Sequence, residues 1–255
     1  KKFGRFTLSD TEYKALLGLT VEKDTEIQRI MLNILDTVYT DSISEDNDKE
    51  LESLAQRNHV RIKRTDKKNL TKLTGSDRHQ GVAAEVNDYK TYSLEEIMHV
   101  ENGKRGLLIL LDELEDPHNL GAILRSADAI GATGVIFKKT HAVGLTPTVA
   151  KVSAGAIDTV KCAAVTNLSR AIETLQKNGW WVVGTDMNGQ DYRQLNYDFN
   201  CVLVIGNEGK GISRLIREKC DYVVKIPMVG KIESLNASVS AGVLMYGIFN
   251  ARNPL

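Results

Sequence analysis

Residues 202–247 read VLVIGNEGKGISRLIREKCDYVVKIPMVGKIESLNASVSAGVLMYG, and this stretch decides the fold class. Two apolar strands are predicted at 202–205 and 222–226. Each leads into a loop rich in Gly, Asn, Glu or Ser and then into a helix, at 213–219 and 235–249. Open α/β sheets bind small ligands at the loops that follow the carboxyl ends of parallel strands. The stretch therefore predicts a cofactor site in a parallel α/β sheet.

The glycine-rich segment after the first strand argues against two common nucleotide sites. Lys210 is followed by Gly211 rather than by Ser or Thr, so the hydroxyl that binds magnesium in a P-loop is missing. The glycine spacing is not G-x-G-x-x-G, and Glu208 would repel a polyphosphate. A carboxylate beside glycines suits a ligand that is cationic or rich in hydroxyl groups. S-adenosylmethionine fits that description.

Three segments carry a resemblance to a known family. They are NLGAILR at 119–125, GNEGKG at 206–211, and the pair IPMVG and SLN between 226 and 236. In this order they resemble motifs 1, 2 and 3 of the SPOUT methyltransferases, in the SpoU/TrmH family of RNA ribose 2′-O-methyltransferases. The resemblance covers residues 106–252, and more loosely the chain from about residue 51. DELEDPHNLGAILRSADAIGA and HQGVAAEV are most similar to enzymes that methylate a guanosine ribose in large-subunit ribosomal RNA.

This resemblance implies a fold and a domain organisation. A small α/β, L30e-like RNA-binding domain is expected at 1–90, a linker at 91–105, and the methyltransferase domain at 106–255. The last of these should be a parallel sheet with helices on both faces and a carboxyl-terminal deep trefoil knot. The alternation of apolar strands and helices from residue 106 independently favours such a sheet. In the first domain we expect helices at 27–34 and 49–57 and strands at 36–39 and 60–62.

The resemblance also implies which residues carry the reaction. The expected catalytic residues are Asn119, Arg125, Glu208, Ser234 and Asn236. Arg125 is charged at ordinary pH and has no acceptor, so we expect it to clamp the substrate phosphate and stabilise a developing alkoxide.

Each role has a simpler structural alternative. Arg125 can form a surface pair with Asp128, Asn119 is placed to cap its helix, and Glu208 can be a solvated loop carboxylate. Either Ser234 or Asn236 can merely cap the last helix.

Cofactor contacts should come mostly from the backbone of three loops. The expected cofactor-binding residues are Thr185, Gly206, Asn207, Gly209, Ile226, Met228, Leu235 and Asn236. For the apolar residues among them, core packing is the alternative. The last helix is apolar nearly all round and begins with small residues, so it is either central to the monomer or part of a dimer interface. The resemblance favours a homodimer in which Arg125 of one protomer completes the site of the other.

Composition narrows the possible partners. The formal net charge is zero, with 26% charged and 42% hydrophobic residues, so the chain is an ordinary globular protein rather than one that binds nucleic acid over its whole surface. Positive charge gathers locally between residues 57 and 78, which favours contact with RNA phosphates over a merely solvated surface. The expected RNA-binding residues are Arg57, Arg61, Lys63, Arg64, Lys67 and Lys68.

The cysteines and apolar runs bear on metal, membrane and compartment. Cys162, Cys201 and Cys220 lack metal-ligand spacing and lie in or beside apolar segments, so buried free thiols are expected. No metal and no membrane span are expected, and a cytoplasmic location is favoured over a mitochondrial matrix. The predicted function is 2′-O-methylation of a guanosine in large-subunit ribosomal RNA. The alternatives are a tRNA 2′-O-methyltransferase and a catalytically silent RNA-binding or ribosome-assembly protein.

Overall fold

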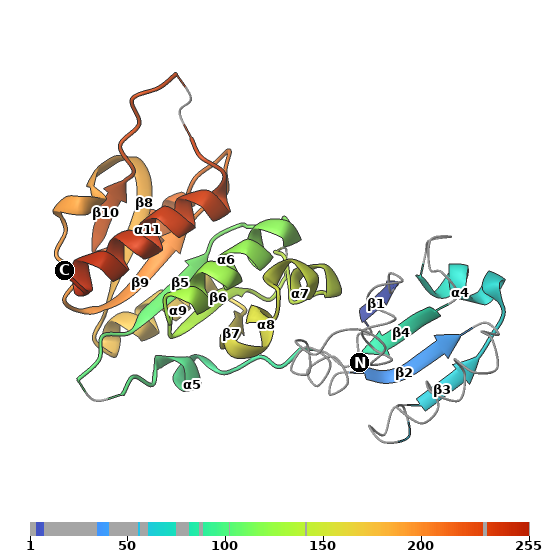
Figure 1. The fold of residues 1–255 in the computed structure, drawn as a ribbon. Coiled ribbons are helices and arrows are strands. Elements are labelled where there is room, and N and C mark those ends of the chain that lie inside the picture. Colours follow the sequence, from blue (N-terminus) through green and yellow to red (C-terminus); the bar gives the residue numbers. More distant parts are fainter. Residues whose placement is uncertain are drawn as a thin grey trace. The chain divides into compact units, whose positions relative to one another are not determined.

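The computed structural model describes residues 4–7, 35–40, 56, 61–74, 82–86, 89–101, 103–140, 142–231 and 234–254. Within it the chain divides into two compact units, Lys1–Tyr89 and Lys90–Leu255 (Figure 1). The helices expected at 27–34 and 49–57 lie outside the described residues, apart from Gln56.

The first unit contains a four-stranded sheet in the order β1-β4-β2-β3. β2 pairs in parallel with β3 and antiparallel with β4, and β1 pairs antiparallel with β4. β3 is an edge strand that leads directly into helix α4. The elements are β1 (Gly4–Thr7), β2 (Leu35–Thr40), β3 (Arg61–Arg64), α4 (Lys67–Thr74) and β4 (Val82–Val86).

The second unit is built on a six-stranded sheet in the order β10-β8-β9-β5-β6-β7, with every neighbouring pair parallel. This confirms the expected parallel α/β fold. The strands are β5 (Leu107–Leu111), β6 (Gly134–Lys138), β7 (Cys162–Val165), β8 (Trp180–Asp191), β9 (Asn200–Ile205) and β10 (Tyr222–Lys225). The trefoil knot in the last strand-loop-helix units stays a prediction.

Helices cover both faces of this sheet. On one face α6 and α11 lie side by side, with α7 and α8 beside α6 (Figure 1). The helices are α5 (Leu94–Met98), α6 (Pro117–Ala129), α7 (Pro147–Ser153), α8 (Ala156–Thr159), α9 (Leu168–Lys177), α10 (Arg214–Arg217) and α11 (Ala237–Arg252), with a short 3-10 turn, η1 (Tyr192–Gln194).

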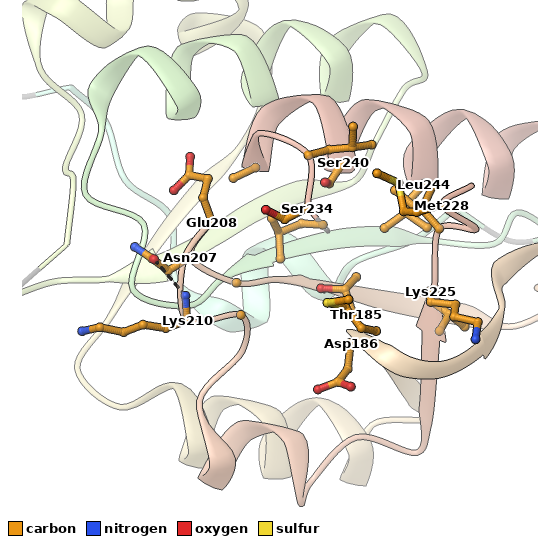
Figure 2. A pocket seen from close by; sticks show the side chains of 18 of the residues that line it. Thr185, Asp186, Asn207, Glu208, Lys210, Lys225, Met228, Ser234, Ser240 and Leu244 are labelled. Carbon is orange, nitrogen blue, oxygen red and sulfur yellow. Dashed lines mark hydrogen bonds between the residues drawn. The ribbon is translucent and has the colours of Figure 1, made fainter. Parts of the chain in front are cut away.

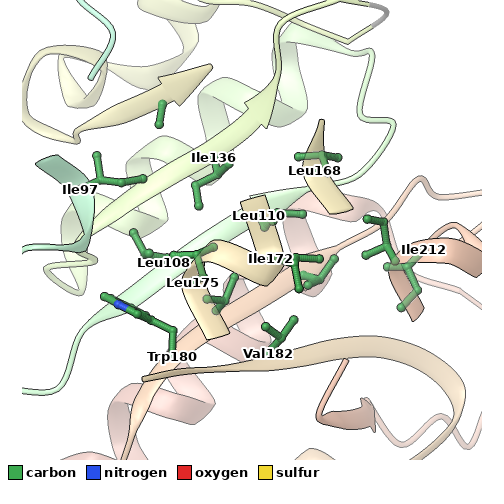
Figure 3. Packing of buried hydrophobic residues seen from close by; sticks show 14 residues of the cluster. Ile97, Leu108, Leu110, Ile136, Leu168, Ile172, Leu175, Trp180, Val182 and Ile212 are labelled. Atoms are coloured by element: carbon green, nitrogen blue, oxygen red, sulfur yellow. The ribbon is translucent and has the colours of Figure 1, made fainter. Parts of the chain in front are cut away.

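The core on the other face explains why β5 is apolar without interruption. Leu108 and Leu110 pack into a cluster with side chains of α9, including Ile172 and Leu175 (Figure 3). The alternate residues of β5 are equally buried on the α6 side. A parallel strand covered on both faces has no polar side, so its sequence cannot alternate.

The segment expected to be a linker packs into the second unit instead. Ile97 of α5 is fully buried in the same core cluster, and the Tyr92 N–H donates to the Cys162 carbonyl at 2.8 Å. The polar sequence around it reflects a short helix closed by a capping box between Ser93 and Glu96. Leu94 and Met98 of the same helix are partly buried and pack against this cluster.

Helix α6 begins two residues earlier than expected, and Asn119 does not cap it. The carboxylate of Asp116 accepts a hydrogen bond from the His118 N–H at 2.8 Å, and Pro117 occupies the first helical position. This is the favoured arrangement for a helix start, because proline lacks an N–H that would otherwise be unsatisfied. Asn119 therefore lies in the first turn, with its side chain available for another partner.

Candidate functional site

A cavity of about 720 Å³ lies beside residues 185–188 of β8 and at the carboxyl ends of β9 and β10, where the sequence predicts a ligand site (Figure 2). Its volume is in the range that holds ligands of nucleoside size. The loops after the three strands supply most of its wall, and the first turns of α11 close one side. The lining residues are Thr185, Asp186, Met187, Asn188, Ile205, Gly206, Asn207, Glu208, Gly209, Lys210, Gly211, Val224, Lys225, Ile226, Pro227, Met228, Ser234, Leu235, Ala237, Ser240 and Leu244.

The GNEGKG loop owes its shape to close backbone approach. A Cβ on Gly206 would lie 2.2 Å from the carbonyl carbon of Gly211, so only glycine fits there. Gly211 has a φ of +68°, and it pairs with Asn207 through reciprocal backbone hydrogen bonds of 2.8 and 3.1 Å. The Asn207 side chain accepts from the Gly209 and Lys210 N–H groups at 2.9 and 3.3 Å. The loop is therefore held closed by its own hydrogen bonds.

Residues just after β5 hold this loop and the start of α10 in place through hydrogen bonds. The buried carboxylate of Asp112 accepts a hydrogen bond from the Ser213 N–H at 2.7 Å, where α10 starts. The next residue, Glu113, has a φ of +55°, and its carbonyl accepts from the Asn207 side chain at 3.3 Å. A non-glycine residue in the left-handed region is strained, and such strain concentrates at functional sites.

The loop after β10 enters α11 at Asn236. The Asn236 side-chain oxygen accepts from the Ser238 and Val239 N–H groups at 3.0 and 3.4 Å and so caps the helix. Its amide nitrogen points the other way and donates to Glu208 at 3.5 Å. Asn236 therefore both caps the helix and contacts the neighbouring loop.

Glu208 joins the three segments that the sequence singled out. Its Oε1 accepts hydrogen bonds from the side-chain amides of Asn119, at the start of α6, and Asn236, at the start of α11. Glu208 is exposed, but these two hydrogen bonds show that it is more than a solvated loop carboxylate. The structure brings together three of the five expected catalytic residues around one carboxylate. A fourth, Ser234, lines the cavity nearby.

Arg125 is the expected catalytic residue that the structure leaves apart. It lies exposed on α6 and does not line the cavity. It makes no ion pair or hydrogen bond with any residue in the described part of the chain. Asp128, the expected surface partner, instead accepts a hydrogen bond from the Thr159 hydroxyl at 2.6 Å. The charge of Arg125 is therefore available to an external anion.

Most of the expected cofactor-binding residues line the cavity. They include Thr185, whose hydroxyl donates to the Val204 carbonyl at 3.0 Å, together with Gly206, Asn207, Gly209, Ile226, Met228 and Leu235. Asn236 lies beside the cavity rather than in its wall.

Several lining residues were not expected from the sequence, notably Asp186, Asn188 and Lys225. The signal that could have found two of them is TDMNG after the apolar run WWVVG, which repeats the strand-then-polar pattern of the GNEGKG loop.

The expected basic strip is partly described. Arg61, Lys63 and Arg64 project from the edge strand β3 with exposed side chains, and Lys67 and Lys68 are exposed on α4. Arg57 lies outside the described residues. These five exposed basic residues lie within eight positions of the chain, so positive charge is concentrated on β3 and the start of α4.

The cysteines are free, as expected. Burial raises the pKa of Cys162, Cys201 and Cys220 to about 12 each, so these thiols are neutral and unreactive at neutral pH. The described residues contain no cluster of side chains that could hold a metal ion. Within the same residues, no helix has the length and apolar character to cross a bilayer.

The cavity fits S-adenosylmethionine on its own chemistry. Backbone groups of the GNEGKG loop and the apolar side chains of Ile226 and Leu235 offer a surface for a flat base. Asp186 and Glu208 are the acidic residues among the described lining residues, and carboxylates suit a ligand that carries positive charge and hydroxyl donors.

Comparison with known proteins identifies the same family at both units. The sequence model of the SpoU rRNA methylase family matches residues 106–246, and that of RNA 2′-O ribose methyltransferase substrate binding matches residues 26–92. YacO of Bacillus subtilis (strain 168), assigned to the TrmH family of tRNA/rRNA methyltransferases, is 47% identical over 205 residues, which cover 79% of this chain and 82% of YacO.

Two solved structures show how far the likeness extends. The SpoU methyltransferase AviRb from Streptomyces viridochromogenes, in complex with the cofactor AdoMet, is 27% identical with a TM-score of 0.69, over 94% of this chain and 96% of AviRb. The TrmH/SpoU tRNA modifying enzyme of A. aeolicus is 28% identical with a TM-score of 0.54, over 62% of this chain and 80% of its own.

Proposed function

Because the chain belongs to the SpoU/TrmH family of S-adenosylmethionine-dependent RNA 2′-O-ribose methyltransferases, we propose that its target is the ribose of a guanosine in large-subunit ribosomal RNA. The observation that carries the site assignment is the meeting of Asn119, Glu208 and Asn236 beside the cavity. The cofactor supplies a methyl group already activated by a sulfonium. The residues of the chain therefore have to hold the reactants in line and help the ribose hydroxyl lose its proton.

Two features support ribosomal RNA over tRNA. The amino-terminal segment matches the family model of RNA 2′-O ribose methyltransferase substrate binding at residues 26–92. The likeness to the tRNA modifying enzyme of A. aeolicus covers only 62% of the chain. An additional substrate-binding domain is useful for selecting one site in a large folded RNA, where a small catalytic surface offers few contacts. We propose guanosine because the segments at 112–132 and 79–86 are most similar to enzymes that methylate a guanosine ribose.

Arg125 acts on the substrate in this proposal, not on the cofactor. Its guanidinium is exposed, lies outside the cavity wall, and is not engaged by other described residues. A guanidinium binds phosphate oxygens in a fixed fork geometry and cannot accept a proton while charged. We assign it to the phosphate beside the target ribose and to the negative charge that develops on the attacking oxygen.

Asn119, Asn236 and Glu208 fix the geometry of the substrate side of the cavity. Because Glu208 accepts from Asn119 and Asn236 at once, the starts of α6 and α11 are held to the GNEGKG loop. Ser234 lines the cavity just before α11 and can donate or accept a hydrogen bond to the substrate. No step of this scheme requires a metal, because the leaving group is a neutral thioether.

We propose that the protein acts as a homodimer through α11. This helix buries Ala241, Leu244 and Ile248 within the unit, yet Val239, Tyr246 and Phe249 on it are 50%, 46% and 38% exposed. Apolar side chains gathered on one face of a helix favour a protein partner. A second protomer docked there can bring its own Arg125, on the adjacent helix α6, to the cavity of the first.

The amino-terminal unit supplies RNA affinity through its basic strip. Arg61, Lys63 and Arg64 on β3 and Lys67 and Lys68 on α4 put five positive charges within one short segment. Such charges bind phosphates without reading sequence, so the strip should raise affinity while the second unit selects the ribose.

Mapping of 2′-O-methylation in RNA from cells with and without this protein tests the proposal. We expect loss of one methylated guanosine in large-subunit ribosomal RNA and no change in tRNA. Loss of a methyl group from tRNA would move the function to the tRNA branch of the family. Unchanged methylation in all RNA would support a silent RNA-binding role.

A further inference from the structure

A bulge in β8 forms one wall of the cavity. β8 pairs with β10 at Gly184 and then not again until Gln190, although the partners on β10, Val223 and Val224, are consecutive. Pairing with β9 also ends at Gly184. Residues 185–189 therefore leave the sheet, and residues 185–188 among them line the cavity.

The return of this bulge to the sheet requires glycine. A Cβ on Gly189 would lie 2.6 Å from the carbonyl carbon of Val224 and 2.7 Å from the Val223 oxygen. The strand can re-enter against the backbone of β10 only without a side chain at this position. The bulge is thus fixed at its end, and the residues that it presents to the cavity are held in place.

Asp186 is the acidic residue that the bulge presents. One carboxylate oxygen accepts from the Asn188 N–H at 2.8 Å, and the other lies 3.2 Å from Nε of Arg217 on α10. In Figure 2, Asp186 and Thr185 lie on the opposite side of the pocket from Ser240 of α11. The Asp186 side chain is 25% exposed against 45% for Arg217, so the carboxylate is the more enclosed partner.

The Asp186 carboxylate can accept further hydrogen bonds, so it favours a ligand group that donates them. An ionised carboxylate offers about four acceptor positions, and the two contacts above use about half of them. Glu208, the other acidic residue in the described wall, is exposed, and its Oε1 accepts two side-chain amides that join its loop to α6 and α11. Asp186 is the more enclosed of the two and takes no part in that contact, so it is the carboxylate placed to accept from a donor inside the cavity. S-adenosylmethionine offers such a carboxylate the 2′ and 3′ hydroxyls of its ribose, two donors on adjacent carbons.

We propose that Asp186 binds the ribose hydroxyls of the cofactor and that Arg217 is a positioning residue which holds its carboxylate. The proposal rests on the cofactor of the family and adds a residue that selects for the intact ribose. An acceptor-only group in a pocket rejects ligands that lack the matching donor, because its acceptors are then left unpaired. Arg217 keeps the carboxylate in one orientation without touching the ligand.

Calorimetric binding of S-adenosylhomocysteine and its 2′-deoxy and 3′-deoxy analogues tests this role without any methyl transfer. Wild type should bind at least one deoxy analogue about tenfold or more weakly than the parent ligand, the effect of one hydrogen bond to a charged group. Asp186→Asn should weaken binding of the parent ligand about tenfold and reduce its advantage over that analogue to less than about threefold. Asp186→Ser, which keeps an acceptor for the Asn188 N–H, should do the same if Asp186→Asn does not fold.

The control is Asp198→Asn, which breaks a comparable exposed ion pair with Arg105 at 3.0 Å, away from the cavity. It should leave all three affinities unchanged. Equal binding of the three ligands by wild type would overturn the role of Asp186 and leave the cofactor site intact. Discrimination that survives in both Asp186 variants would assign the hydroxyls to another residue. Failure of wild type to bind S-adenosylhomocysteine would overturn the cofactor site itself, and this proposal with it.

Discussion

The side-chain amide of Asn119 donates a hydrogen bond to the carboxylate of Glu208, which lies 89 residues further along the chain. This contact joins the start of α6 to the glycine-rich loop after β9. Because Asn236 donates to the same oxygen, one carboxylate fixes the relative positions of three loops. We expect the geometry of the substrate side of the site to depend on this carboxylate more than on any other single group.

The first prediction concerns the charge at this contact. Asn119→Asp should lower the melting temperature by several degrees and methyl transfer by tenfold or more, because two carboxylates then face one another. The double variant Asn119→Asp/Glu208→Gln restores one donor and one acceptor with their roles reversed. It should recover most of the lost thermal stability in a melting experiment. A double variant no more stable than Asn119→Asp would show that the contact contributes little.

A second prediction compares a glycine that has no room for a side chain, Gly206, with one that has room, Gly230. Gly206→Ala should weaken binding of S-adenosylhomocysteine by tenfold or more, because a Cβ there would meet the Gly211 backbone at 2.2 Å. The loop must then open, and its cavity wall moves. Gly230→Ala is the matched control, since a Cβ at that position meets nothing within 4 Å. Calorimetry that finds equal affinities for the two variants would contradict our account of the loop.

Local sequence patterns predict elements of this fold but not the contacts between distant segments. The two strand-loop-helix units, and the alternation of apolar strands and helices from residue 106, follow from apolar periodicity, which is a local signal. The hydrogen-bond partner of Asn119 could not be predicted in this way. A capping position and a first-turn position look alike in sequence, and Asp116 takes the cap because proline follows it directly. The reach of Asn119 to Glu208 depends on how two distant segments pack, which no local pattern encodes.

Strand β8 extends beyond its apolar run for the same physical reason, the packing of distant segments. Its apolar run ends at Gly184, and the polar residues after it have low strand propensity. Residues 185–189 bulge out of the sheet, and Gln190 and Asp191 then pair again with β10, which is a tertiary effect. Asp186 was missed with them. The segment around helix α5 was expected to be a linker because it is polar and charged, although the short helix at 94–98 was foreseen within it; the docking of Ile97 into the core depends on tertiary packing.

The third prediction addresses the dimer. Tyr246→Asp together with Phe249→Asp should convert a homodimer to monomers in sedimentation velocity and abolish methyl transfer, because two charges would be buried at the proposed interface. Leu215→Asp, at a residue of α10 that is 58% exposed, is the control and should leave the assembly intact. A wild-type protein that is monomeric at micromolar concentration yet fully active would contradict the shared site.

A fourth prediction concerns the division of labour between the two units. Changing Arg61, Lys63, Arg64, Lys67 and Lys68 together to Gln should raise the KM for RNA. The slope of log affinity against log salt should become shallower by roughly 0.7 to 0.9 for each phosphate that the variant no longer binds. Cofactor affinity should not change. Lys177→Gln, on α9 of the second unit, serves as the control. Unchanged RNA affinity and an unchanged salt slope would reduce the strip to a solvated surface.

The most direct test of the central claim is methyl transfer by the purified protein to ribosomal RNA from cells that lack it. With labelled S-adenosylmethionine and a chelator present, wild type should label large-subunit RNA, and nuclease digestion should recover the label as 2′-O-methylguanosine. Arg125→Ala should transfer no label while binding S-adenosylhomocysteine within a few fold of wild type, and Arg170→Ala, at an exposed position on α9, should behave as wild type. Label in tRNA or in another nucleoside, or full transfer by Arg125→Ala, would contradict the account.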